Sequence, residues 1–195
     1  MSGWPLKDQA RVAGIDDGPY IRGSKTTPCV ITVARLDGYI EGFIPLSIST
    51  DGEDSAERIS TALKGSRFRS QIRAVLSDGA CLGGFNVLDL EELHRSCQVP
   101  IITCSDERPD DVSILEALKN HFDDWKERYD LITRWKVNEV ELDSGPCFVR
   151  CEGTAEDRAE WIVRKATLRG RMPEPIRISH LVAGALFPKG GTRHG

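Results

Sequence analysis

The chain has 195 residues, of which 39% are hydrophobic and 29% are charged, and its formal net charge at pH 7 is −4. These values are typical of a soluble globular protein. The net charge of the whole chain is weakly negative, so it does not by itself indicate binding to nucleic acid. No apolar run approaches the roughly 18 residues of a membrane-spanning helix, and the first residues lack the apolar core of a signal peptide. We therefore expect one cytoplasmic domain over residues 1–195, with about residues 1–10 and 188–195 flexible.

The six cysteines are scattered along the chain, and none forms a CxxC pair. The four histidines are not clustered near them, so the pattern argues against a structural zinc site. Cys147 and Cys151 would face the same side of a strand. We expect reduced thiols packed in a core.

Basic residues are concentrated in two segments, although the chain as a whole is acidic. Such runs are usually solvated faces, but an enzyme that meets DNA briefly could use them for phosphate contacts. They are Arg58, Lys64, Arg67, Arg69 and Arg73 in the first segment, and Arg164, Lys165, Arg169, Arg171 and Arg177 in the second.

The first part of the chain reads as three strands in meander order. Residues 11–16 form a short apolar run that ends in Asp-Asp-Gly-Pro. Residues 29–37 are rich in β-branched side chains, and Asp37-Gly38 is a strong signal for a two-residue hairpin turn. Residues 39–49 then return as the partner strand.

The rest of the chain alternates helices with strands, which predicts a mixed α/β sheet flanked by helices. We expect helices at 56–66, around 87–97, at 109–122, 125–135, 154–170 and 176–187, strands at 73–79 and 99–105, and a hairpin formed by 135–143 and 146–153.

Three acidic turns fall where such a sheet would bring them together. Asp16 ends the first strand, Asp51, Glu53 and Asp54 precede the first long helix, and Asp78 ends the strand that follows. Sites in open α/β sheets form outside the carboxyl ends of strands. Converging carboxylates would repel one another unless a cation neutralised them, and hard oxygen ligands select Mg²⁺ or Mn²⁺. Taken singly, each turn is ordinary turn chemistry.

The order of these turns matches a ribonuclease H-like fold, namely a three-strand meander followed by βαβ units, with an extra hairpin and C-terminal helices. Five segments in order resemble motifs of the endonuclease dU family, which is related to endonuclease V. They are "GIDDGPY", "STDGEDSAERI", "VLSDGACLGGFNVLDL", "VPIITCSDERPDD" and "PEPIRISHLVAGAL". The resemblance runs from about Arg11 to Leu186, and "DGACLGGFNVLDL" is its most specific part.

The resemblance implies metal-dependent cleavage of DNA at deoxyuridine, the product of cytosine deamination, by a triad of acids. Asp16 and Asp78 correspond to the first and third acids of that triad. Asp54 is the favoured middle acid, with Asp51 and Glu53 as rivals. Ala56 replaces a threonine that we expect after the middle acid, and the tail "FPKGGTRHG" follows the family's ending only loosely, so the fine substrate preference stays open.

Other residues near these motifs have both a functional and a structural interpretation. Phe85 could stack on a flipped base and Asn86 could read its edge, or they could pack in the core and cap a helix. Arg108 could contact a phosphate or pair with acidic neighbours. His180 could belong to the active site, or to a core or an interface. Asp17 could support the metal ligands or cap its own turn.

Two other functions compete with a nuclease. "GIDDG" also resembles the phosphate-binding hairpin of sugar kinases and actin-like ATPases, but those proteins need two such domains and this chain is too short. A catalytically silent nucleic-acid-binding module would keep the basic surfaces without needing the acids to converge. The favoured partner is DNA that contains deaminated bases, with no membrane involved, and the sequence leaves room for a homodimer.

Overall fold

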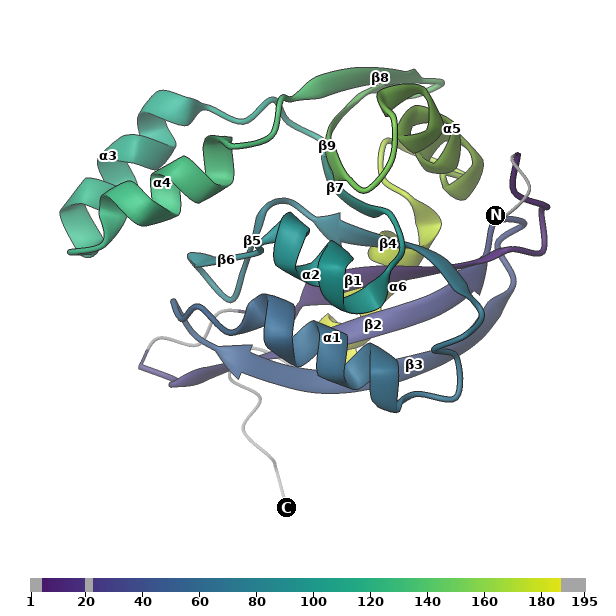
Figure 1. Cartoon of the computed structure of the whole chain (residues 1–195), viewed down its shortest axis with the longest axis horizontal. Helices are drawn as coiled ribbons and strands as arrows, with labels where there is room; N and C mark the ends of the chain where they lie inside the picture. Colours follow the sequence, from purple (N-terminus) through teal and green to yellow (C-terminus); the bar gives the residue numbers. More distant parts are fainter. Residues whose placement is uncertain (1–4, 20–22, 187–195) are drawn as a thin grey trace.

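The computed structural model describes residues 5–19 and 23–186, which form nine strands and six helices (Figure 1). The strands are β1 (Arg11–Asp17), β2 (Thr26–Arg35), β3 (Ile40–Ser49), β4 (Ile72–Asp78), β5 (Cys81–Leu82), β6 (Asn86–Val87), β7 (Ile101–Ser105), β8 (Asn138–Leu142) and β9 (Gly145–Glu152). The helices are α1 (Ser55–Gly65), α2 (Leu90–Cys97), α3 (Asp111–His121), α4 (Trp125–Thr133), α5 (Glu156–Ala166) and α6 (Glu174–Leu186). The predicted elements are confirmed, with boundaries that shift by a few residues.

Seven of the strands form one mixed sheet in the order β3-β2-β1-β4-β7-β9-β8. β1, β4 and β7 run parallel, while β2 and β9 run antiparallel to their neighbours. The turn at Gly38, which has a φ of 90°, joins β2 to β3 as the sequence predicts. Since β1, β4 and β7 are parallel, their carboxyl ends meet at one edge of the sheet.

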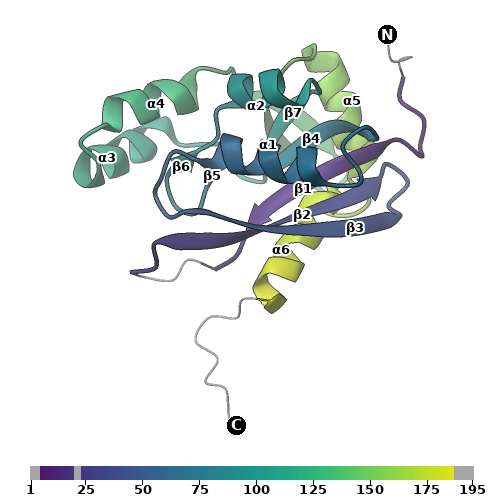
Figure 2. The same ribbon diagram turned by 60° about the horizontal axis from the view of Figure 1, so that its bottom comes forward.

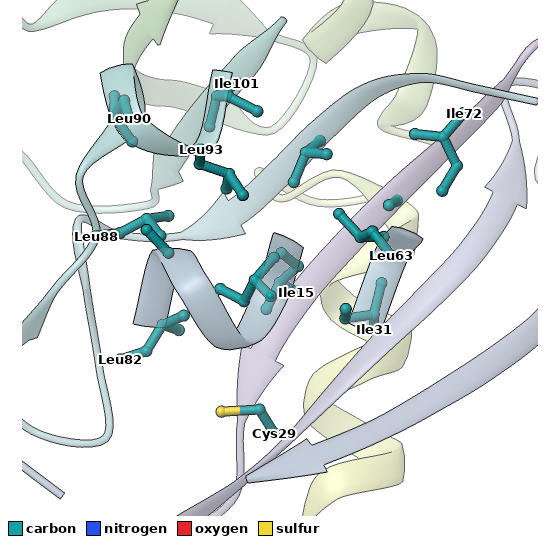
Figure 3. Close-up of a cluster of buried hydrophobic side chains, with 14 of the residues drawn as sticks. Ile15, Cys29, Ile31, Leu63, Ile72, Leu82, Leu88, Leu90, Leu93 and Ile101 are labelled. Atoms are coloured by element: carbon teal, nitrogen blue, oxygen red, sulfur yellow. The ribbon is translucent and has the colours of Figure 1, made fainter. Parts of the chain in front are cut away.

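Helices cover both faces of this sheet. α1 and α2 lie on one face, above a cluster that includes Ile15, Ile31, Leu63 and Leu93 (Figure 3). α5 and α6 pack on the opposite face against a second cluster, and Figure 2 shows α6 below the sheet and α1 above it. Side chains on β1 alternate between these two faces, so neighbouring residues of one strand enter different environments.

α6 is fastened directly to the middle of the sheet. A Cβ atom on Gly14 would lie 2.3 Å from the carbonyl carbon of Pro175, so only glycine lets the helix approach this closely. The Ser179 hydroxyl accepts a hydrogen bond from the Thr32 backbone N–H (3.0 Å) and donates to the Gly14 carbonyl (2.9 Å). Gly14 and Thr32 face each other across the β1–β2 pair. Ser179 therefore bridges two strands and fixes the position of α6.

α3 and α4 form a helical hairpin beside the sheet, next to the short β5–β6 pair (Figure 1). Val87, Leu118 and Ile132 form a third buried cluster at this junction. The Arg128 guanidinium donates to the backbone carbonyls of Gly52 (3.0 Å) and Phe85 (2.6 Å). The hairpin is thus tied to the loops that follow β3 and β5.

Several other sequence expectations concern the chain ends, the thiols and membranes. Most of the residues predicted to be flexible lie outside the described part, but Leu6 and Ala10 pack against the α5–α6 side of the sheet. All six cysteines are free thiols, and Cys147 and Cys151 share the same face, as predicted.

In the part of the chain that the structure describes, no helix has the length and apolarity to span a membrane.

The contact between β1 and α6 predicts opposite effects for two glycine substitutions. Gly14→Ala should destabilise the protein by about 1–3 kcal/mol, because the added methyl group overpacks the junction. Gly184→Ala, in α6, has no atoms within 4 Å of the new methyl group and should stabilise by roughly 0.5–1 kcal/mol through helix propensity. Urea unfolding of both variants measures this difference. Equal effects would mean that α6 does not pack tightly on β1.

Candidate active site

The parallel pairing of β1 with β4 places two acids side by side at the carboxyl ends of these strands. Ile15 lies opposite Ser77 in this parallel pair, and the next residues along the strands are Asp16 and Asp78. Asp16 points toward α6, since its Oδ2 lies 2.8 Å from Nδ1 of His180. Two strands distant in sequence therefore end in neighbouring carboxyl groups, as the sequence pattern predicts.

These two carboxyl groups resist ionisation. Burial raises the pKa of Asp16 to about 7, and the charges of Asp78 and Asp17 add to the effect. Burial also raises the pKa of Asp78 to about 6, with further contributions from Asp106 and Asp17. Only 3% of Asp16 is exposed. Buried acids that repel each other in this way are typical of sites that share protons or bind cations.

Asp17 points to the other face of the sheet and holds the glycine turn that follows β5. Its Oδ2 accepts a hydrogen bond from the Gly83 N–H (2.6 Å). Gly83 and Gly84 have φ values of 56° and 86°, which favour glycine. The Gly83 carbonyl accepts from the Asp51 N–H (2.9 Å), and Oδ1 of Asp51 accepts from the Phe85 N–H (2.9 Å). This turn thus connects the first acidic turn to the second.

Asp54 lies just before α1 and is held by its neighbours. Oδ1 accepts from the Ser49 N–H (2.9 Å) and from Nδ2 of Asn86 (2.8 Å), and Oδ2 lies 3.2 Å from Nε of Arg58. Partial burial works against ionisation, but these hydrogen bonds outweigh it and lower the pKa of Asp54. Asn86 is fully buried, and its Oδ1 accepts from the Ser55 N–H (3.1 Å). The carbonyl oxygen and the amino group of the Asn86 side chain are therefore both used within the protein.

Acids of the first and second turns lie near one buried thiol, that of Cys29 on β2. Burial raises the pKa of this thiol, and the charges of Asp17, Asp16 and Asp54 raise it further. Acids of the first and second turns therefore lie close to the same side chain at this edge of the sheet. Among the described residues, no three His, Cys, Asp or Glu side chains are arranged to hold a metal ion. The structure therefore brings the turns together without fixing a complete ligand set.

The remaining residues of the second and third turns make contacts within the protein. Glu53 is 77% exposed at its side chain and lies 3.5 Å from the guanidinium of Arg128. Phe85 is partly buried, and its ring packs edge-on against Phe122, with centroids 5.5 Å apart. Phe85 thus lies in a small core at the α3–α4 hairpin.

Arg108 and His180 lie at the surface. Arg108 pairs with Oε2 of Glu139 at 2.9 Å and stacks over the ring of Phe148. The His180 side chain is 72% exposed, although its Nδ1 contacts Asp16. An ionised Asp16 can only accept, so Nδ1 of His180 then carries the proton. The exposed ring of His180 therefore contacts the buried carboxyl group of Asp16 from the surface.

Sequence reasoning missed Asp106 as a site residue. It follows the last residue of β7, Ser105, and its charge raises the pKa of Asp78. The Arg171 guanidinium pairs with Oδ2 of Asp106 at 3.3 Å. The signal was present, because Asp106 is an acid directly after the next parallel strand of the same sheet.

The raised pKa values predict how stability depends on pH when no metal is present. The folded acids hold their protons while the unfolded chain ionises, so the wild type loses stability as the pH rises from about 4 to about 7. Asp78→Asn removes the part of this loss that Asp78 causes, and its advantage over the wild type should grow between about pH 4 and pH 6 to roughly 3 kcal/mol at most. Urea unfolding in EDTA at several pH values checks this. An advantage that does not change with pH would contradict it.

Comparisons with known proteins bear on this arrangement. A family model described as endonuclease dU matches residues 8–187. The UPF0215 protein of Methanothermobacter thermautotrophicus is 36% identical over 183 residues, which cover 93% of this chain and 89% of that protein. A crystal structure from Archaeoglobus fulgidus has 30% identity and a TM-score of 0.80, and the match covers 90% of this chain and 97% of that one.

A more distant likeness identifies the fold. Endonuclease V from Ciona intestinalis, in complex with a 23mer DNA containing an inosine followed by a ribo-adenosine, has 14% identity and a TM-score of 0.62. The match covers 91% of this chain and 85% of that one. It confirms the predicted ribonuclease H-like fold. With the match of the family model over most of its length, the chain belongs to the endonuclease dU family.

Proposed function

We propose that the protein is a metal-dependent endonuclease that cleaves the DNA backbone near deaminated bases, most readily deoxyuridine, in DNA repair. The observation that carries this proposal is the adjacency of Asp16 and Asp78 on two parallel strands. Family membership and the ribonuclease H-like fold support a nuclease. The DNA in the Ciona complex contains inosine, the nucleoside of a deaminated base, which supports this class of substrate.

The residues present fit a divalent cation at the Asp16–Asp78 pair. Burial and neighbouring negative charges raise the pKa of both carboxyl groups, and a positive charge between them would relieve this effect. Their oxygen atoms suit Mg²⁺ or Mn²⁺. We propose Asp54 as the third acid, because its pKa is lowered and it is held in one position; Asp51 and Glu53 are the rival candidates. A bound cation of this kind makes a coordinated water more acidic and offsets charge on the phosphate.

The surrounding side chains would orient the substrate. His180 contacts Asp16 through Nδ1, and the exposed part of its ring would be free to contact a phosphate. Arg108 would supply a further phosphate contact, for which it must leave its exposed ion pair with Glu139. Such exposed pairs contribute only about 0–1 kcal/mol, so this exchange costs little. Asp17 would hold the glycine turn beside the acids, and Phe85 would border the substrate from that turn.

A nicking assay tests the proposed activity. Labelled duplexes carry one uracil, one hypoxanthine or no lesion, with and without Mg²⁺. The wild type should cleave lesion-containing duplexes only with the metal. Asp16→Asn should reduce cleavage by at least about 10³-fold, an effect typical of removing a group from the reacting centre, without unfolding the protein. Asp143→Asn, an exposed acid in the β8–β9 turn, is the matched control and should cleave like the wild type.

Two results would contradict the nuclease. If Asp16→Asn cleaves at the wild-type rate, Asp16 does not take part in the reaction. Saturable DNA binding without cleavage of any substrate would favour the second candidate, a catalytically silent nucleic-acid-binding module.

Metal binding can be measured without any substrate. Mg²⁺ or Mn²⁺ at 100 times its Kd should stabilise the wild type by about 2.7 kcal/mol at pH 7.5, through binding to the folded state alone. For a chain of this length, that corresponds to a rise in Tm of several degrees. Asp78→Asn should show a much smaller rise, since one ligand is lost. Equal rises in both proteins would place the cation elsewhere.

A further inference from the structure

Three polar side chains lie in a row across the face of the sheet opposite Asp16 and Asp78. Ser77 on β4 pairs with Thr103 on β7, and Thr103 pairs with Arg150 on β9. Their exposed fractions are 0%, 2% and 5%, respectively. Strands lie about 4.8 Å apart, so the row spans about 10 Å between its outer Cα atoms. Most other buried positions of the sheet carry apolar side chains, so a row of three buried polar groups is unusual.

Two atoms of the row lack hydrogen-bond partners within the protein. Oγ of Ser77 and Nε of Arg150 are buried atoms that have none. The other buried arginine, Arg128, shows the contrast, because it pairs with Asp124 at 2.9 Å and donates to two backbone carbonyls. A buried donor without a partner is strongly unfavourable. A chain that retains such groups has a use for them outside its own folding.

The charge of Arg150 points to a ligand that accepts hydrogen bonds. Burial lowers the pKa of Arg150 from its ordinary value, while Asp111 and Cys81 oppose that shift. An arginine stays protonated in proteins, so the side chain can only donate. The hydroxyl groups of Ser77 and Thr103 can both donate and accept. The row thus offers the donors of Arg150 together with two hydroxyl groups that can donate or accept. This combination suits a ligand with a carbonyl oxygen next to an N–H.

The row lies at the catalytic edge of the sheet. Ser77 directly precedes Asp78, and successive side chains of a strand point to opposite faces. A nucleotide with its phosphate at the acids could thus place its base on the row. A backbone phosphate is bonded to a sugar on each side, so it cannot enter a buried site without the rest of the strand. A base is attached to its sugar by one glycosidic bond and can turn out of the strand alone.

We propose that Ser77, Thr103 and Arg150 form the recognition site for the carbonyl edge of an extruded deaminated base, uracil or hypoxanthine. This inference rests on the proposed nuclease function. Asn86, the other candidate for reading a base, uses both the oxygen and the nitrogen of its side-chain amide within the protein.

The chemistry of the row explains which bases it would accept. Uracil and hypoxanthine present a carbonyl oxygen beside an N–H, whereas cytosine and adenine present an amino group in that place. An amino group facing the Arg150 guanidinium would set donor against donor and leave both unpaired, which a site built for hydrogen bonds rejects strongly. The row does not touch the methyl group that separates thymine from uracil. Discrimination against thymine would come from the lower cost of extruding a mismatched base.

Base extrusion is measured in EDTA, where no metal-dependent cleavage occurs. The probe is a duplex with one U·G mismatch beside 2-aminopurine, whose fluorescence rises when its neighbour leaves the stack. Wild-type protein should raise the fluorescence with U·G and not with C·G. Arg150→Met and Thr103→Val should each weaken the preference for U·G at least tenfold, while Arg150→Lys, which keeps a donor, should retain part of it.

Thermal unfolding separates recognition from structural support. Arg150→Met removes a buried guanidinium whose Nε has no partner and should melt no lower than the wild type, whereas Arg128→Met breaks paired contacts and should melt lower. If the wild type cleaves uracil duplexes but Arg150→Met and Thr103→Val keep the full preference for U·G, the inference is wrong and the proposed nuclease stands. If the wild type neither extrudes nor cleaves any lesion, the proposed function fails, and the inference fails with it.

Discussion

The parallel pairing of β1 with β4 is the constraint on which the site depends. It brings Asp16 and Asp78 together at the end of two buried strands, where both burial and the negative charges of neighbouring acids oppose ionisation. A fold selected for stability alone has no reason to place two acids there, because apolar or amide side chains would avoid the cost. The arrangement becomes favourable once a cation shares the two carboxylates. We therefore regard this repulsion as the mark of the proposed metal site.

Two other features position groups around that pair from opposite faces of the sheet. On one face, the close approach of α6 at Gly14 and the Ser179 bridge bring His180 to Asp16. On the other face, the glycine turn at Gly83 binds Asp17. Since residues of a strand alternate between faces, a shift of one residue along β1 would exchange these environments. Register thus decides which acid faces α6.

The order of elements and the acidic turns were predictable, because periodicity and turn residues such as Asp37-Gly38 act locally. The partners of buried polar groups were not. Asn86 binds Asp54 across 32 residues, and nothing in "GGFN" signals that contact. Arg150 sits in "CFVRC", where alternation shows which face it occupies but not that its Nε lacks a partner. Ser179 beside His180 gave no sign of bridging strands, since that depends on a glycine 165 residues away.

The most direct test of the central claim is a crystal structure of the wild-type protein soaked in Mn²⁺, with the metal located by its anomalous scattering. We predict an anomalous peak bridged by the carboxylates of Asp16 and Asp78, in coordination distance of both. Oxygen ligands from these two strands would show that their repulsion is relieved by a shared cation. A fully occupied manganese site elsewhere on the molecule, with Asp16 and Asp78 left free of metal, would contradict the account.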